Sequence, residues 1–254
     1  MRILKLTFFL ILLGMPVFAA DIKSGDDLIA AMHKKYDGKW YKTLTFVQKT
    51  TNYKPDGTSE SSTWYEALNA PGKLRIDFTP LENNEGILFA EGKLYSFRGG
   101  KLAGSRPFIH PLLALGFDVY CQSVETTLGQ LKDLNIDTSV VHQEKWQGKS
   151  VYVVGARAGD LGSPQFWVDK NDLLFMRLFE LAGKDKKSVH ETQFNKYVKI
   201  KTGGWVAAEV QFFTDGKKAT TEVYTDIQTG MALDADLWNP EKWTTVDRSY
   251  FEKK

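Results

Sequence analysis

Apolar and polar residues alternate along most of this chain, most clearly over residues 44–98. About five strand-like runs follow one another there, separated by turns rich in Gly, Pro, Asn and Asp. In the run 73–78, Leu74, Ile76 and Phe78 share one face, and the residues between them are charged. Runs joined by such short turns predict one antiparallel sheet with an apolar face.

Two segments have helical spacing instead. An apolar stripe from Leu28 to Tyr36 follows Ser24, which is suited to cap a helix that ends at Gly38. Residues 111–134 predict two short helices in the middle of the chain, and the leucines at their start are too closely spaced for a polar surface helix. These helices therefore need an apolar partner, and the sheet is the surface available to them.

Strand-like runs resume after Asn135 and continue to residue 228, and the tail after Gly230 is irregular and rich in Trp. No linker, low-complexity tract or repeat divides the chain, so we expect one domain over residues 20–254. The fold class predicted is mainly β, with about 11 antiparallel strands, a leading helix and helices inserted in the middle. A sheet of that size must curl, split or close.

The first 19 residues have the pattern of a secretory signal peptide. Arg2 and Lys5 precede a short apolar core, and small or β-branched residues at positions 17 and 19 predict cleavage after Ala19. No Cys follows the apolar core, so we do not expect a lipid anchor. A soluble, exported product is the expectation, and an uncleaved membrane anchor is the alternative.

Charge and cysteine content narrow the possible partners. Two of the 33 Lys and Arg residues lie in the first 19 positions, which leaves 31 to balance the 31 Asp and Glu residues. A near-neutral chain argues against a nucleic-acid surface. Cys121 is the one cysteine, which excludes an internal disulfide and a cysteine-based metal site.

Motifs of catalysis or metal binding are missing or incomplete. His190-Glu191 begins like a zinc-protease helix, but Phe194 stands where the second His belongs. The other histidines lie far apart in sequence, and neither Ser105 nor Ser163 lies in a nucleophile elbow. We therefore expect no enzyme activity, no cofactor and no metal site. Aromatic residues at alternate strand positions predict either an ordinary core under the helices or an apolar pocket.

The order of these elements resembles the periplasmic lipoprotein-carrier family LolA and its LolB and RseB relatives. The shared features are an export signal, a leading helix, the Phe46-x-Gln48 strand, a dipeptide that ends at Pro71, the strand 73–80, and Glu91-Gly92-Lys93 before another strand. The resemblance covers nearly all of residues 20–254. It implies an incomplete, half-open antiparallel β-barrel, closed by a helical lid at Pro111 to Leu134, with a cavity between them for acyl chains.

On this resemblance, the apolar side chains expected to line the lipid cavity are Phe46, Leu74, Ile76, Phe78, Phe89, Tyr95, Phe97, Leu112, Leu113, Phe117, Phe166, Phe175, Phe179, Val210 and Phe212. One position departs from the family. Carriers of this type have an Arg directly before the proline that helps to latch the lid, and here that residue is Ala70. Arg75 is nearby, but it belongs to the opposite face of its strand from Ile76, so we do not assign it that role.

Three hypotheses follow. The first is a monomeric periplasmic carrier that binds acyl chains of a lipoprotein or another lipid, ferries them towards the outer membrane, and contacts donor and acceptor proteins of the two membranes transiently. The second keeps the fold but makes it a lipid-sensing accessory or regulatory protein. The third is an exported hydrolase whose site is assembled from scattered residues. The cargo and the resting state of the lid stay open.

Overall fold

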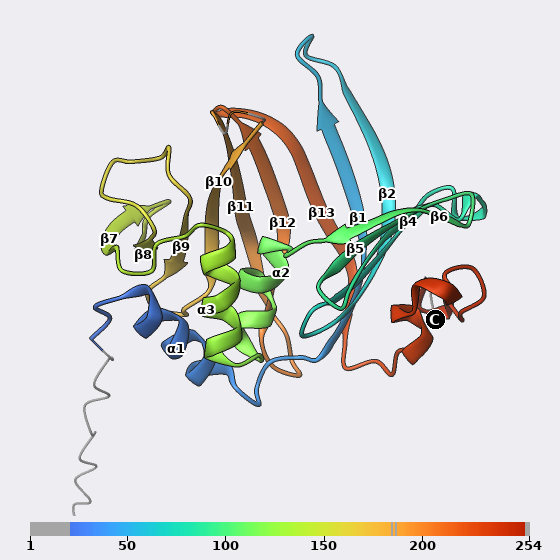
Figure 1. The fold of residues 1–254 in the computed structure, drawn as a ribbon, viewed down its shortest axis with the longest axis horizontal. Helices are drawn as coiled ribbons and strands as arrows, with labels where there is room; N and C mark the ends of the chain where they lie inside the picture. The colour runs from blue at the N-terminus through green and yellow to red at the C-terminus, as the bar shows by residue number, and fades with distance from the viewer. Residues whose placement is uncertain (1–20, 184, 186, 252–254) are drawn as a thin grey trace, which may run out of the picture.

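One antiparallel sheet of 13 strands forms the body of the computed structural model, which describes residues 21–183, 185 and 187–251 (Figure 1). The predicted signal peptide, residues 1–19, lies outside this range. In chain order the strands are β1 (Thr43–Tyr53), β2 (Ser59–Asn69), β3 (Lys73–Phe78), β4 (Gly86–Ala90), β5 (Lys93–Arg98), β6 (Lys101–Pro107), β7 (Val141–Trp146), β8 (Lys149–Val154), β9 (Gln165–Asp169), β10 (Phe175–Ala182), β11 (Ser188–Lys199), β12 (Trp205–Thr214) and β13 (Lys217–Thr229).

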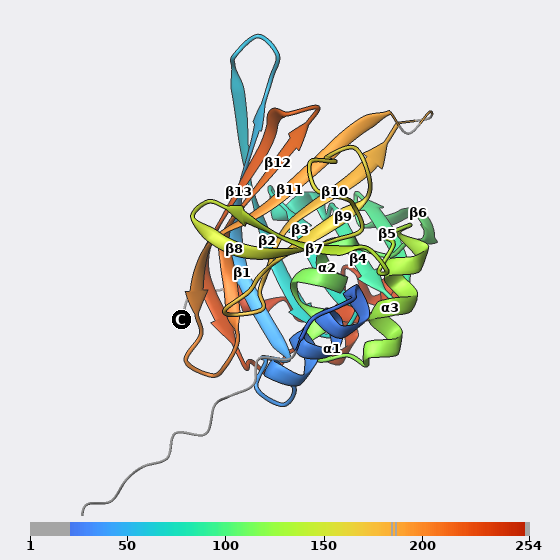
Figure 2. The same cartoon turned by 90° about the vertical axis from the view of Figure 1, so that its left-hand side faces the viewer.

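The sheet is curved but open. Its strand order is β6-β5-β4-β3-β2-β1-β13-β12-β11-β10-β9-β8-β7, so β6 and β7 are its two edges (Figures 1 and 2). All neighbours are consecutive in sequence except β1 and β13, whose pairing runs from Leu44↔Thr229 to Asn52↔Thr220. That single non-local pairing joins two meanders into one sheet.

Three α-helices and a 3-10 turn cover one face of the sheet, and we call them the helical cover. They are α1 (Gly25–Tyr36), α2 (Pro111–Gly116), η2 (Asp118–Tyr120) and α3 (Val124–Asp133). Ser24 caps α1 as predicted: its hydroxyl accepts a hydrogen bond from Asp27 N–H at 3.1 Å, and the Asp27 carboxylate accepts one from Ser24 N–H at 3.0 Å. The predicted apolar stripe of α1 is buried against the main core. Among the described residues, no helix has the length and hydrophobicity that a membrane span requires.

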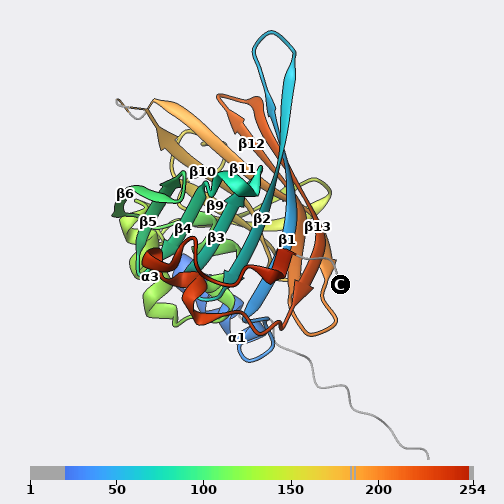
Figure 3. The same ribbon diagram turned by 90° about the vertical axis from the view of Figure 1, so that its right-hand side faces the viewer.

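The C-terminal segment lies on the opposite face of the sheet from the helical cover (Figure 3). It contains three short 3-10 helices, η3 (Ala235–Trp238), η4 (Pro240–Lys242) and η5 (Ser249–Phe251). Trp243 stacks on Phe97 of β5, with ring centroids 4.1 Å apart and ring planes 2° from parallel. Tyr95 and Leu88 belong to the same cluster. Strands β3 to β5 are therefore covered on both faces, which explains why β4 and β5 carry apolar residues on both.

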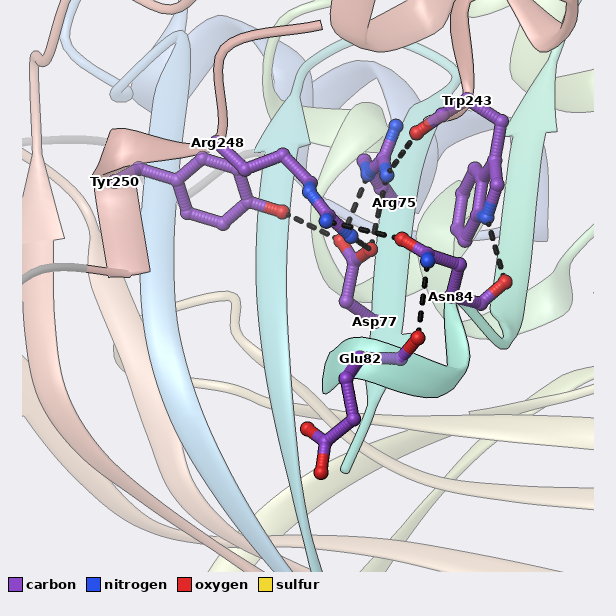
Figure 4. A network of polar contacts seen from close by, with 7 residues as sticks. All are labelled: Arg75, Asp77, Glu82, Asn84, Trp243, Arg248 and Tyr250. Carbon is purple, nitrogen blue, oxygen red and sulfur yellow. Dashed lines mark hydrogen bonds and ion pairs between the residues drawn. The ribbon is translucent and has the colours of Figure 1, made fainter. Parts of the chain in front are cut away.

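A buried ion pair fastens this segment to β3 (Figure 4). The Arg75 guanidinium donates to the Asp77 carboxylate at 2.7 and 2.9 Å and to the Trp243 carbonyl at 2.9 Å, and it lies 3.7 Å from the Trp243 ring centroid. Both charged side chains are at most 1 % exposed. Arg248 and the Tyr250 hydroxyl also donate to Asp77. Arg75 thus points away from the helical cover, as the alternation predicted.

The sequence predicted most of these elements. The antiparallel meanders, the N-terminal helix and the helices in the middle of the chain are confirmed, but the sheet has 13 strands and not about 11. The strand β6 was missed because every residue of it is exposed, so no alternation of burial marks it. Turns and hairpins elsewhere lie where the Gly, Asn and Asp residues placed them.

We expect Arg75→Met to lower the free energy of unfolding by about 3–5 kcal/mol, because it leaves the buried Asp77 carboxylate without its bidentate partner. Urea unfolding followed by circular dichroism measures this loss. The matched control is Lys23→Met, which removes an ion pair with Asp21 whose side chains are 76 % and 81 % exposed. Equal stability of the two variants would show that the buried pair does not hold the C-terminal segment.

Candidate functional site

An apolar cavity of about 140 Å³ lies between the sheet and helix α2 of the helical cover, and we call it the inner cavity. Six neighbouring strands, β3, β2, β1, β13, β12 and β11, form its floor, and α2 with its flanking residues forms its roof. Its lining residues are Phe46, Gln48, Trp64, Glu66, Leu68, Leu74, Ile76, His110, Leu112, Leu113, Phe117, Phe194, Phe212, Glu222 and Tyr224. Most of this lining is hydrocarbon, so the cavity is suited to an apolar ligand.

A wider and more open depression, the outer groove, borders the inner cavity. Its volume is about 410 Å³, and it shares His110, Leu112 and Phe212 with the inner cavity. The ends of β10 and β12, the beginnings of β11 and β13, and Phe108 and Pro111 form the rest of its wall. Burial lowers the pKa of His110 to about 4, so this residue is neutral where the two spaces meet.

Four polar side chains interrupt the apolar floor of the inner cavity: Glu66, Gln48, Tyr224 and Glu222. The Tyr224 hydroxyl donates to Glu222 Oε2 at 3.1 Å, and the Gln48 amide donates to Thr50 Oγ1 at 2.8 Å. Burial raises the pKa of Glu222 to about 7. Burial, and secondarily the negative charge of Glu222, raises the pKa of Glu66 well above its ordinary value. Burial therefore favours the uncharged form of both carboxyl groups.

Strand register places these four side chains on one face. Gln48 of β1 pairs with Trp64 of β2 on one side and with Tyr224 of β13 on the other. Glu66 pairs with Phe46 on one side and with Ile76 on the other. Directly paired residues of antiparallel strands point to the same face, so the apolar and polar residues of the floor form one surface.

The helical cover is attached to the sheet mainly away from α2. The Tyr120 hydroxyl accepts a hydrogen bond from Phe175 N–H at 2.9 Å, and the Tyr120 ring stacks on Trp40 at 3.9 Å between centroids. Gly72 N–H donates to Asp118 Oδ2 at 3.0 Å. This last bond joins the helical cover to the loop that contains Ala70. Ala70 is the position at which the resembling carriers have the arginine that helps to latch the lid.

Seven of the residues expected to line a cavity do line the inner cavity: Phe46, Leu74, Ile76, Leu112, Leu113, Phe117 and Phe212. The Phe78 ring contacts that of Trp64, a lining residue, with centroids 4.8 Å apart and ring planes tilted by 46°. Phe89 lines a smaller side cavity of about 90 Å³, next to Asp118 and Gln130. Phe166, Phe175 and Val210 are buried in the main core and do not line the inner cavity.

Three of the expected residues lie on the opposite face of the sheet. Tyr95 and Phe97 pack under the C-terminal segment, because alternation separates two faces without showing which of them is concave. Phe179 belongs to an outer cluster with Trp167. A β-bulge between Phe175 and Arg177 reverses the alternation in β10, so Phe175 and Phe179 point to opposite faces.

Three polar lining residues were not among those predicted from the sequence: Gln48, Glu66 and Glu222. Each lies two residues from an aromatic or aliphatic residue that lines the same cavity. Gln48 follows Phe46, Glu66 precedes Leu68, and Glu222 precedes Tyr224. Their alternation with these neighbours was the available signal. Because the cavity was predicted from apolar side chains alone, this alternation did not lead to the three polar residues.

The Asp118 carboxyl group, which is 1 % exposed, makes stability depend on pH. Burial raises its pKa from 3.8 to about 7, so the folded state binds more protons than the unfolded state between these two values. Its contribution to stability is therefore fully present below pH 3.8 and is lost as the pH rises through about 7. We expect Asp118→Asn to reduce the decline of unfolding free energy over this range by up to about 1.4 kcal/mol per pH unit.

Urea unfolding of the wild type and of Asp118→Asn at a series of pH values from 4 to 8 measures this difference. Asp133→Asn is the matched control, since Asp133 is an exposed carboxylate at the end of α3. Parallel curves for the wild type and Asp118→Asn would contradict the expectation.

Among the described residues, no group of three or more His, Cys, Asp or Glu side chains is arranged to hold a metal ion. No protein-family model and no curated protein matches the sequence. Solved structures do match the fold. One is a putative outer membrane lipoprotein-sorting protein domain from Vibrio parahaemolyticus, with a TM-score of 0.57 and 14 % identity over 85 % of this chain and 96 % of that one.

Two further structures agree with it. A DUF1329 family protein from Desulfovibrio piger has a TM-score of 0.56 and 13 % identity over 84 % of this chain and 95 % of that one. A LolA superfamily protein from Nitrosomonas europaea has a TM-score of 0.52 and 11 % identity over 82 % of this chain and 96 % of that one. From the curved open sheet, the helices on its inner face and these matches, we conclude that the chain has a LolA-like fold.

Proposed function

We propose that this protein is a periplasmic carrier that holds an alkyl chain of a lipid or lipoprotein in the inner cavity. The observation that carries the proposal is the apolar inner cavity under α2, bordered by the wider outer groove. The similarity to a lipoprotein-sorting domain and to a LolA superfamily protein supports the same class of ligand. Such a carrier needs no catalytic group, because burial of the chain supplies the affinity.

The size of the inner cavity indicates that α2 moves when a long chain binds. At about 140 Å³ it is close to a cavity that accepts a benzene-sized molecule. Burial of about twelve methylene groups is worth roughly 10 kcal/mol, part of which offsets the loss of freedom on association. Only a chain that occupies more than the closed cavity gains that much, so the rest of it extends into the outer groove or the space opened by α2.

The attachments of the cover support α2 as the moving part. Tyr120 and Asp118, which follow α2, hold the cover to the sheet and to the loop after β2. Among the described residues, no hydrogen bond joins Pro111–Gly116 itself to a strand. His110 Nδ1 accepts from Leu113 N–H of the same turn at 3.4 Å, and before the helix Phe108 N–H donates to the Gly92 carbonyl at 2.9 Å. In this proposal the carrier acts as a monomer, and donor and acceptor proteins of the inner and outer membranes bind it transiently.

Leu112→Glu should abolish most of the binding of an alkyl chain, because it places a carboxylate where the inner cavity meets the outer groove. The measurement is fluorescence of the neutral dye N-phenyl-1-naphthylamine and its displacement by 1-dodecanol. We expect the wild type to take up the dye and release it to dodecanol, and the variant to bind at least about tenfold more weakly.

Leu102→Glu is the matched control, since Leu102 on the edge strand β6 is 54 % exposed and lines neither the inner cavity nor the outer groove. Its dye binding should equal that of the wild type. Failure of the wild type to bind the dye, or equal binding by both variants, would refute the proposed use of the cavity.

A further inference from the structure

Glu66 is the least satisfied polar group in the floor of the inner cavity. Its side chain lines the cavity, the residue is 4 % exposed, and no described residue donates a hydrogen bond to its carboxyl group. Leaving a buried polar group without a partner is costly, and a bare alkyl chain packed against it would not remove that cost. The site therefore lacks a hydrogen-bond donor that a ligand could bring.

The neighbouring donors are already in use. The Tyr224 hydroxyl donates to Glu222, and the Gln48 amide lowers the pKa of Glu222 through a hydrogen bond and also donates to Thr50. The residues that line the inner cavity include no Lys or Arg. The floor thus presents two carboxyl groups, Glu66 and Glu222, without a cation to pair with them.

We propose that the inner cavity selects alkyl chains that carry a primary ammonium group, which binds between Glu66 and Glu222 while the chain packs on the apolar floor and under α2. An ammonium group has three donors and a positive charge, so it satisfies both carboxyl groups through charge-assisted hydrogen bonds. The inference rests on the proposed function, because it requires that alkyl chains enter this cavity. It adds the chemical class of the ligand: an amphiphilic amine.

The hydrocarbon lining fits this orientation. Around the two carboxyl groups, Phe46, Ile76 and Phe212 supply apolar floor, and Leu112 supplies apolar roof towards the outer groove. A chain bound by its amine at the floor extends past Leu112 into the outer groove. A fatty acid in the same place would bring a third carboxyl group into a cavity lined by two, and its negative charge is unfavourable beside theirs.

The experiment compares 1-dodecylamine, 1-dodecanol, dodecyltrimethylammonium and dodecanoate as competitors of N-phenyl-1-naphthylamine, each below its micelle concentration, at pH 8. We expect dodecylamine to bind about 10- to 100-fold more tightly than dodecanol. The trimethylammonium compound has the charge without N–H donors and should fall between them, and dodecanoate should be weakest. In Glu66→Gln/Glu222→Gln the preference should disappear, so that dodecylamine and dodecanol displace the dye equally well.

Glu60→Gln is the matched control, because Glu60 lies on the same strand as Glu66 and is exposed. This variant should keep the preference for the amine. Equal displacement by amine and alcohol in the wild type, or a preference that survives the double substitution, would overturn this inference and leave the proposed carrier function standing. Failure of all four compounds to displace the dye would overturn both.

A pH series on the wild type tests the inference even if the double variant does not fold. The titratable groups that line the inner cavity are Glu66, Glu222, Tyr224 and His110. His110 stays neutral because burial lowers its pKa to about 4, and Tyr224 stays neutral because burial raises its pKa well above 10. The ratio of amine to alcohol affinity should therefore rise roughly tenfold between pH 6 and 8 as the carboxyl groups ionise against the ammonium. A ratio that is independent of pH would contradict the pairing.

Discussion

The pairing of β1 with β13 is the constraint on which the rest of this structure depends. It is the one pairing between strands that are far apart in sequence, and it turns two meanders into a single curved sheet. The floor of the inner cavity is centred on it, with β2 and β3 on one side and β12 and β11 on the other. Closure of so long a loop is unfavourable in entropy, so burial along this seam must offset it. Neither meander alone contains a complete site.

The two faces of the sheet are stabilised in different ways. On the face of β3 that carries Arg75, the C-terminal segment stabilises the strand. The contacts are the buried Arg75–Asp77 ion pair, the Trp243 ring stacked on Phe97, and hydrogen bonds from the segment. On the other face, Leu74 and Ile76 of the same strand line the inner cavity. The same strand therefore serves both the structure and the site.

Much of the fold could be predicted from the sequence, because alternation, turn residues and helix caps are local signals. The limits of β1 and β3 and the Ser24 cap came from such signals. What the sequence could not supply was non-local. Alternation does not say which face of a strand is concave, so Tyr95 and Phe97 were assigned to the wrong side. The bulge in β10 likewise moved Phe179 to the outer face. The grouping of Glu66 with Glu222 needs the β1–β13 seam, which no local pattern predicts.

We propose above all that an alkyl chain occupies the space between α2 and the strands on either side of the β1–β13 pairing. A crystal structure of the protein with a bound dodecyl amphiphile tests it most directly. We expect continuous density for the chain against Phe46, Ile76 and Phe212, with α2 displaced from its position over the closed cavity. A chain bound elsewhere on the molecule, with the inner cavity still closed and empty, would contradict it.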